Sequence, residues 1–438
     1  MEDLLDVDSP PPYVRQDGYS KQREMKEFSI SFKPGERVEG SLNLFFDSAL
    51  SKNMPTLIEG SPLKGNVTLK LDRPDSITSV SFGVDGEFLL GGTTGTEENY
   101  FFLKEERSIW SSTDGEPRPS FDDSTPVEKL TFKGTLHGGY TWPISFDLPK
   151  EVEIKKKQTS RTFPLPQSFS EKFIRATIRY TVWVKVARRG FLATDKTLSM
   201  PFTYVRVTSP PALPPLREVV YQEGTPLLSP SVYPDGWHTE GPLQIKGILS
   251  KTVPFTFQCT LYLAKPLAYT TGNFVPLFLK FESDNVNVLE LLSNPKAIHA
   301  RIRRYTVDHI HASNALDNNS FRDYLDYSQR AVWWPSDENT GSGGVRLMNG
   351  EVHLKPAMYP NTELGNFRLR YSVMLYDFEA TALEFRETKF LQEVPIEICT
   401  LYGPGPRPKS VTPHNTEPDV GYGKLIVPYM NQYSKGFY

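Results

Sequence analysis

The feature that most constrains the fold is a pair of similar segments far apart in the chain. The two segments are Ile178-Arg179-Tyr180-Thr181-Val182 and Leu369-Arg370-Tyr371-Ser372-Val373. In each, apolar and polar residues alternate, and a strand places alternate side chains on opposite faces. Prolines precede both copies, at residues 163–169 and 354–360. A spacing of 191 residues between the tyrosines is too long for a solenoid repeat, so the pair predicts one β-domain built twice.

Length and composition agree with two β-domains. The chain has 438 residues, and a sandwich can reach about 200–250 residues as a single domain. Its 37 prolines exceed the usual share of about 5% and are typical of short strands joined by turns. The net charge of −3 gives no general attraction to nucleic acid.

The cysteines and the N-terminus indicate the compartment. Cys259 and Cys399 are the only cysteines, which excludes a disulfide framework and favours a reducing environment. The first residues are acidic and lack the apolar run of a signal peptide. No stretch approaches the roughly 18 uninterrupted apolar residues of a membrane span. We therefore expect a cytoplasmic protein without a transmembrane segment.

Composition along the chain predicts five segments. Residues 1–27 form a disordered leader, because they are acidic and then polar and proline-bearing. The first sandwich is expected over 28–208 and the second over 217–402. Residues 209–216 form a proline-rich linker, since consecutive prolines donate no ladder bonds and hold the chain extended. Residues 403–438, rich in Pro, Gly and Tyr, are expected to form a loose tail.

Two departures from a simple series of strands are also expected. Asp85-Gly86 is a turn signal that would close a strand, and residues 89–128 read as a long surface excursion with a short helix near 100–110. A second insertion, at 312–342, contains a helical pattern. That pattern comprises Phe321, Tyr324, Leu325 and Ala331.

Several motifs in the same order resemble the arrestin family. They are Lys64-Gly65-Asn66-Val67-Thr68-Leu69, then 77–86, Tyr140-Thr141-Trp142-Pro143-Ile144, Pro166-Gln167-Ser168-Phe169, 178–186 and 350–374. The resemblance covers roughly residues 28–402. It implies an all-β fold of two tandem antiparallel β-sandwiches. It also implies an adaptor that binds other proteins, for which we expect no cofactor.

The leader contains a short proline motif that is typical of WW-domain ligands. Pro10, Pro11 and Tyr13 fit the PPxY pattern that WW domains read. Successive prolines pre-set a polyproline II helix, so little entropy is lost on docking in an aromatic groove. The α-arrestins, which this combination resembles, recruit HECT-type ubiquitin ligases with WW domains to membrane transporters or receptors. In that class the motif usually lies in the C-terminal tail, whereas here it lies near the N-terminus. The alternative interpretation is a leader merely stiffened by proline.

A second motif precedes it. Leu4, Leu5, Val7 and Asp8 fit the clathrin-box pattern of apolar residues followed by an acid. Its alternatives are a plain acidic tail or a strand that pairs with a sheet edge. A clathrin partner is thus a further expectation, and it agrees with recruitment to the plasma membrane or endosomes.

Other conspicuous residues favour simpler interpretations. His309 and His311 share one strand face, but no adjacent cluster completes a metal site. Lys155-Lys156-Lys157 reads as a solvated loop, with contact to anionic lipid as the alternative. Trp333-Trp334 reads as a packing anchor. No phosphate-binding loop or nucleophile motif is present, so we expect neither a metal site nor catalysis.

Three functional hypotheses follow. The first is an arrestin-like adaptor that links membrane cargo to a WW-domain ubiquitin ligase and to endocytic trafficking. The second is a retromer-like endosomal sorting scaffold that recruits no ligase. The third is a β-sandwich that binds or hydrolyses sugars, which would require an extracellular address and a carboxylate pair.

Overall fold

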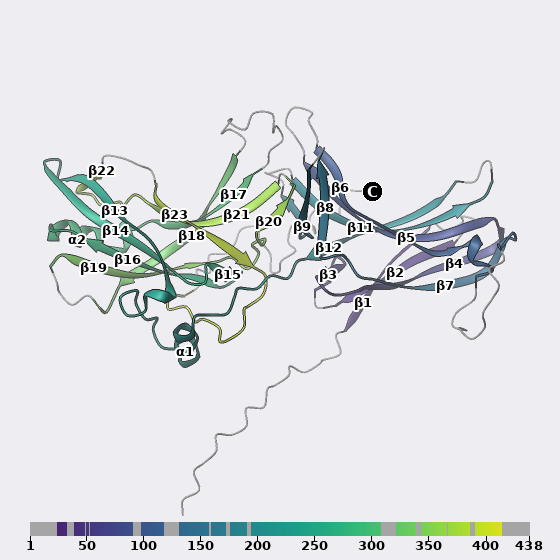
Figure 1. Cartoon of the computed structure of the whole chain (residues 1–438), viewed down its shortest axis with the longest axis horizontal. Helices are drawn as coiled ribbons and strands as arrows, with labels where there is room; N and C mark the ends of the chain where they lie inside the picture. The colour runs from purple at the N-terminus through teal and green to yellow at the C-terminus, as the bar shows by residue number, and fades with distance from the viewer. Residues whose placement is uncertain are drawn as a thin grey trace, which may run out of the picture.

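The structure, a computed structural model, describes residues 24–32, 39–48, 50–51, 53–90, 98–117, 131–156, 159–171, 176–190, 194–307, 321–338, 343–365, 367–385 and 390–413. These residues are mostly β and form two sandwiches in tandem. The sandwiches are the two lobes of Figure 1, joined by an extended linker. The prediction of an all-β, two-sandwich fold is confirmed.

The first sandwich contains two main sheets. One has the order β1-β2-β4-β7 and the other β3-β12-β11-β5-β6, with β10 paired to β11. A separate hairpin, β8–β9, completes this half. The strands are β1 (Met25–Ser31), β2 (Glu39–Asp47), β3 (Thr56–Ile58), β4 (Leu63–Asp75), β5 (Ile77–Leu90), β6 (Glu98–Ser111), β7 (Leu136–Phe146), β8 (Glu151–Lys156), β9 (Thr159–Pro164), β10 (Phe169–Glu171), β11 (Ala176–Arg188) and β12 (Lys196–Val205), with a 3-10 turn η1 (Ser112–Asp114).

The second sandwich is one continuous sheet folded into two layers. Its order is β15-β23-β21-β17-β18-β19-β16-β14-β13-β22, with β20 paired to β21. The elements are α1 (Pro215–Glu223), η2 (Pro234–Gly236), β13 (Trp237–Leu249), β14 (Val253–Ala264), β15 (Ala268–Thr270), β16 (Phe274–Glu282), α2 (Val286–Leu292), η3 (Pro295–Ala297), β17 (Ala300–Val307), β18 (Phe321–Pro335), β19 (Val345–His353), β20 (Thr362–Leu364), β21 (Phe367–Tyr376), β22 (Leu383–Phe385) and β23 (Phe390–Cys399). The first part of β18 pairs with β17 and its last part with β19, so this strand belongs to both layers.

The two halves repeat the same strand order. The order β3-β12-β11-β5-β6 of the first half corresponds to β15-β23-β21-β17-β18 of the second. Even the exceptional parallel pairs agree, because β3 runs parallel to β12 and β15 runs parallel to β23. The short strands β10 and β20 occupy equivalent places beside β11 and β21. The repeat seen in the sequence is therefore a repeat of topology.

The repeated tyrosines lie at the centre of this correspondence. Tyr180 on β11 is 0% exposed and Tyr371 on β21 is 2% exposed. The Tyr180 hydroxyl donates to the Pro166 carbonyl at 2.5 Å, and the Tyr371 hydroxyl donates to the Tyr359 carbonyl at 2.9 Å. Each tyrosine thus fastens the proline-bearing segment that precedes it. Arg179, between buried neighbours, faces outward as its place in the alternation predicts.

Aromatic rings connect the two halves. Phe169 from the first half lies 4.8 Å from the Tyr359 ring and 5.3 Å from the Phe367 ring of the second, centroid to centroid. Phe88 on β5 also contacts Phe367, at 5.6 Å. At the surface of the junction, Arg161 Nη2 lies 3.3 Å from Glu363 Oε1. The halves therefore share a small apolar contact at their facing ends.

Several local predictions are wrong, for one reason. Residues near 100–110 form β6 and not a helix, and the predicted helix at 321–331 lies in β18. The Asp85-Gly86 pair lies within β5, where a register shift follows Gly86 instead of a turn. In each case ladder pairing with a long neighbouring strand overrides the local signal. The predicted excursion over 89–128 is correspondingly interrupted by fourteen residues of strand.

The linker and the tail also differ from expectation. Pro215 and Leu216, predicted as linker, are the first residues of α1. Residues 403–413, predicted as a loose tail, lie against the second sandwich through contacts described below. Lys155 and Lys156 belong to β8, and Lys157 lies outside the described residues.

Candidate functional site

Helix α1 begins and ends where its sequence requires. Pro215 occupies its first position, where the missing N–H costs nothing and the fixed φ suits a helix. Gly224 ends it with a left-handed φ of 70°, and its N–H donates to the Val220 carbonyl. Glycine is favoured there because a Cβ strains this conformation.

One face of α1 is fixed to the outer face of the second sandwich. The Arg217 side chain is only 3% exposed, and its Nη2 donates to the Gly236 carbonyl at 2.7 Å. Its guanidinium also lies 4.9 Å from the centroid of the Trp237 ring. Trp237 and Phe278 belong to a small apolar cluster on this outer face, separate from the main core. β16 is thereby covered on both sides.

The last described residues, 402–413, form a segment that we call the strap. Just before it, the Thr400 and Leu401 amides donate to the Thr208 carbonyl at 3.1 and 2.8 Å, which holds the chain beside the linker. The Thr270 hydroxyl donates to the Leu401 carbonyl at 2.9 Å. Within the strap, the Arg407 guanidinium lies 4.4 Å from the centroid of the Tyr402 ring.

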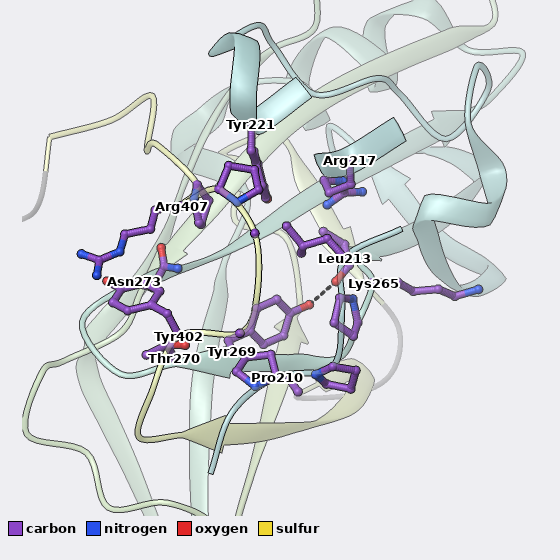
Figure 2. Close-up of a pocket in the computed structure, with 18 of the residues that line it drawn as sticks. Pro210, Leu213, Arg217, Tyr221, Lys265, Tyr269, Thr270, Asn273, Tyr402 and Arg407 are labelled. Atoms are coloured by element: carbon purple, nitrogen blue, oxygen red, sulfur yellow. Dashed lines mark hydrogen bonds between the residues drawn. The ribbon is translucent and has the colours of Figure 1, made fainter. Parts of the chain in front are cut away.

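Two adjoining cavities, together called the cleft, lie among α1, the strap and the sheet. They share three residues, Tyr221, Phe274 and Pro276, and have volumes of about 60 and 330 Å³. Figure 2 shows the smaller cavity, which is lined by Tyr221, Tyr269 and Arg217, with Tyr402 and Arg407 of the strap on the opposite side from Arg217. Its lining is notable for prolines: Pro210, Pro211, Pro266, Pro276, Pro404, Pro406 and Pro408.

The larger cavity has a mixed lining. Rings and an aliphatic side chain form one part of it, contributed by Trp237, Trp334 and Leu227. Polar side chains form another part, and Lys409, Ser410 and Val411 of the strap form one wall. A mostly apolar hollow with a few polar groups is typical of binding sites.

A buried carboxylate anchors the strap. Glu351 on β19 is 2% exposed, and its side chain lies on the face opposite the core residue Val352. Its carboxylate accepts hydrogen bonds from the Val411 amide at 3.2 Å, the Thr412 amide at 2.6 Å and the Thr412 hydroxyl. His353 Nε2 lies 3.3 Å from the same carboxylate and 2.9 Å from the Thr412 hydroxyl oxygen. Glu351 is therefore the point where the strap joins the sheet.

Burial keeps two tyrosines and the two cysteines of the second sandwich protonated. Desolvation raises the pKa of Tyr221 and that of Tyr269, whose hydroxyl donates to the Ala264 carbonyl at 2.5 Å. Burial likewise raises the pKa of the Cys399 thiol to about 11, and that of Cys259 further still. Thiols held in this form are poor nucleophiles.

Among the described residues, no three His, Cys, Asp or Glu side chains are grouped to hold a metal ion. Over the same part of the chain, no helix has the length and apolarity needed to cross a membrane.

The structure does not test the motifs predicted from the sequence. Pro10, Pro11 and Tyr13, and likewise Leu4, Leu5, Val7 and Asp8, lie outside the described residues. So do His309 and His311. The described chain begins at residue 24, next to β1, and among the described residues this edge strand pairs with β2.

The residues of the cleft were missed from the sequence. Glu351 and Thr412 lie 61 residues apart and carry no motif that links them. The one available signal was an acid in the middle of a strand, next to Val352. Comparison with known protein families and with curated proteins finds no match to this chain.

Proposed function

We propose that this chain is an arrestin-like adaptor that links membrane cargo to a WW-domain HECT-type ubiquitin ligase. The observation that carries the proposal is the duplicated sandwich with matching strand order, joined to a leader that contains Pro10, Pro11 and Tyr13. The order of the sequence motifs, which resembles that of the arrestins, supports the same conclusion.

In the proposed mechanism the leader binds the ligase and the two sandwiches bind the cargo. The leader motif docks in the ligase's WW domain as a polyproline II segment, with the Tyr13 ring in a pocket of that domain. The sandwiches bind a membrane transporter or receptor. A single short motif binds weakly, but a tether of this length raises the local ligase concentration to roughly millimolar.

The site of action belongs to the same proposal. The protein acts in the cytoplasm and is recruited peripherally to the plasma membrane or endosomes by its cargo. Leu4, Leu5, Val7 and Asp8 would add a contact to clathrin, which places the complex in endocytic trafficking.

The test compares two tyrosines of the leader. Tyr13→Ala removes the ring that the motif requires, whereas Tyr19→Ala removes a ring outside the motif and serves as the matched control. We expect tandem WW domains to capture the wild-type and Tyr19→Ala chains but to lose the Tyr13→Ala chain. Capture of Tyr13→Ala at the wild-type level would refute the ligase contact. Failure to capture even the wild type would instead favour the retromer-like sorting scaffold.

A further inference from the structure

The attachment of the strap depends on one hydroxyl and two amides. The Thr412 hydroxyl and the Val411 and Thr412 amides all donate to the Glu351 carboxylate. An ionised carboxylate only accepts hydrogen bonds, so this arrangement requires donors on the strap. The Thr412 hydroxyl is one such donor, and it lies between Glu351 and His353.

The other strap contacts are peripheral. Gly405 has a φ of +103°, and a Cβ there would lie 3.5 Å from Glu218 Oε1 of α1. The Lys409 ammonium lies beside Gly224, the residue that caps α1. Gly403 approaches the Pro210 carbonyl of the linker closely, because a Cβ would lie 2.8 Å from that oxygen. The strap thus crosses from linker to α1 to β19, and at its far end it donates hydrogen bonds to the buried Glu351 carboxylate.

Thr412 has the sequence context of a modification site. It is followed by Pro413, and a threonine followed by proline is the minimal acceptor of proline-directed protein kinases. Arg407 and Lys409 lie upstream. Val411, its preceding neighbour, is 71% exposed, so the segment around the hydroxyl faces solvent.

We propose that Thr412 is a phosphorylation site and that its modification releases the strap from Glu351. A proline-directed kinase supplies ATP as co-substrate. A bond forms between Thr412 Oγ1 and the γ-phosphorus while the bond from that phosphorus to the β–γ bridging oxygen breaks. ADP departs, and the hydroxyl proton passes to a base of the kinase.

Phosphorylation would turn the attraction between Thr412 and Glu351 into a repulsion. The modified side chain has no hydroxyl hydrogen to donate, and it brings nearly two negative charges beside a carboxylate that is 2% exposed. The His353 imidazole lies beside both the Glu351 carboxylate and the Thr412 oxygen that would carry the phosphate. Of the cationic groups of the strap, Arg407 lies over Tyr402, and Lys409 lies beside Gly224 in the wall of the larger cavity. Like charges at this distance and low exposure repel strongly, so the closed arrangement is lost.

The modification also selects a state that already exists. In the closed strap the Thr412 hydroxyl is engaged by Glu351 and His353, so a kinase reaches it only when the strap has opened. Phosphorylation then prevents reclosing, which is a population shift toward the open state. Opening removes Lys409, Ser410 and Val411 from the wall of the larger cavity. The cleft thereby becomes accessible from that side.

The experiment measures strap closure directly on the full chain. The protein is phosphorylated with a proline-directed kinase and ATP, the modified residue is identified by mass spectrometry, and amide hydrogen exchange is followed over residues 402–413. We expect phosphorylation of Thr412 to speed exchange of the Val411 and Thr412 amides at least tenfold. The core amides of β11 and β21 should not change, which separates strap release from unfolding.

Three variants make the result specific. Ser410→Ala, which removes the neighbouring hydroxyl, should leave both phosphorylation and release intact. Thr412→Ala should abolish the phosphorylation-dependent change. Glu351→Gln removes the buried charge at constant shape, so phosphorylation should accelerate exchange less there than in the wild type.

Two results would overturn the proposal. One is unchanged exchange at Val411 after stoichiometric phosphorylation of Thr412. The other is failure of Thr412 to be phosphorylated even in Glu351→Gln, whose weakened attachment exposes the strap. Neither outcome depends on WW-domain binding, so this inference and the adaptor function are tested separately.

Discussion

Tyr180→Phe isolates one buried hydrogen bond in the first sandwich. The substitution keeps the ring, which packs against Tyr204, Phe202 and Phe102 at centroid distances of 5.3, 5.6 and 5.5 Å. It removes only the hydroxyl that donates to the Pro166 carbonyl at 2.5 Å. Pro166 is itself buried, so water does not replace the lost donor.

The magnitude follows from that burial. A buried acceptor left without a partner costs about 1–3 kcal/mol. The equivalent change, Tyr371→Phe, frees the carbonyl of Tyr359, which is only half-buried and so remains accessible to water. That variant should lose about 0.5–1.5 kcal/mol, the usual net value of a hydrogen bond. Tyr180→Phe should therefore lower the free energy of unfolding more than Tyr371→Phe does.

Urea unfolding and thermal melting measure the difference. For a sandwich of this size, each kcal/mol corresponds to about 2–4 °C in Tm. Arg179→Ala is the control, because this side chain is 49% exposed and pairs with Glu87 at the surface, where a pair contributes less than about 1 kcal/mol. If Tyr180→Phe were as stable as Arg179→Ala, the reasoning about the tyrosine-to-carbonyl contact would be wrong.

The remaining predictions concern buried charge and pH. Burial raises the pKa values of Tyr180 and Tyr269 above the usual value near 10, so the folded chain keeps protons that the unfolded chain loses above that pH. The contribution of these tyrosines to the free energy of unfolding should be fully present below pH 10. Above pH 10 it should fall by about 1.4 kcal/mol per pH unit for each tyrosine. Urea unfolding from pH 8 to 11 measures this change, and a flat profile would contradict the prediction. Asp75→Ala should cost about 3–5 kcal/mol in the same assay, because it leaves the Arg188 guanidinium, 13% exposed and 2.6 Å from the Asp75 carboxylate, without its partner. The double variant Asp75→Ala/Arg188→Met, which removes both charges, should cost less than Asp75→Ala alone, and the reverse order would count against the unpaired buried charge as the cause.

The duplicated architecture could be predicted because apolar and polar residues alternate along the repeated strands. Residues 178–186 and 367–375 each show a period of two, and this period fixed the buried faces of β11 and β21. What alternation does not fix is where a strand ends. β5 passes through Asp85-Gly86, and β18 forms where a helical pattern is present, because partners such as β11 and β17 supply the ladder bonds. Such pairing is long-range and leaves no local mark in the sequence.

The cleft could not be predicted for a related reason. Its parts come from the linker, α1, β19 and the strap, which are close only after the second sandwich has formed. Glu351 occupies an outward position on its strand, where an acid is ordinarily solvated. Residues 411 and 412 return to cover it and donate hydrogen bonds to its carboxylate. The leader motifs are the opposite case, since they are readable without a fold and remain predictions.

The strand β18, shared between both layers, determines how the second sandwich comes apart. An event that detaches one layer must break the ladder of β17 with β18 or that of β18 with β19, and both ladders hold the same strand. Neither layer can therefore persist intact while the other melts, and this half should unfold in a single cooperative step. In the described part of the first half, the sheets β1-β2-β4-β7 and β3-β12-β11-β5-β6 share no strand, so the edge strand β1 can fray without breaking a ladder bond of the second sheet. Unfolding of the whole chain should then begin where the leader is attached.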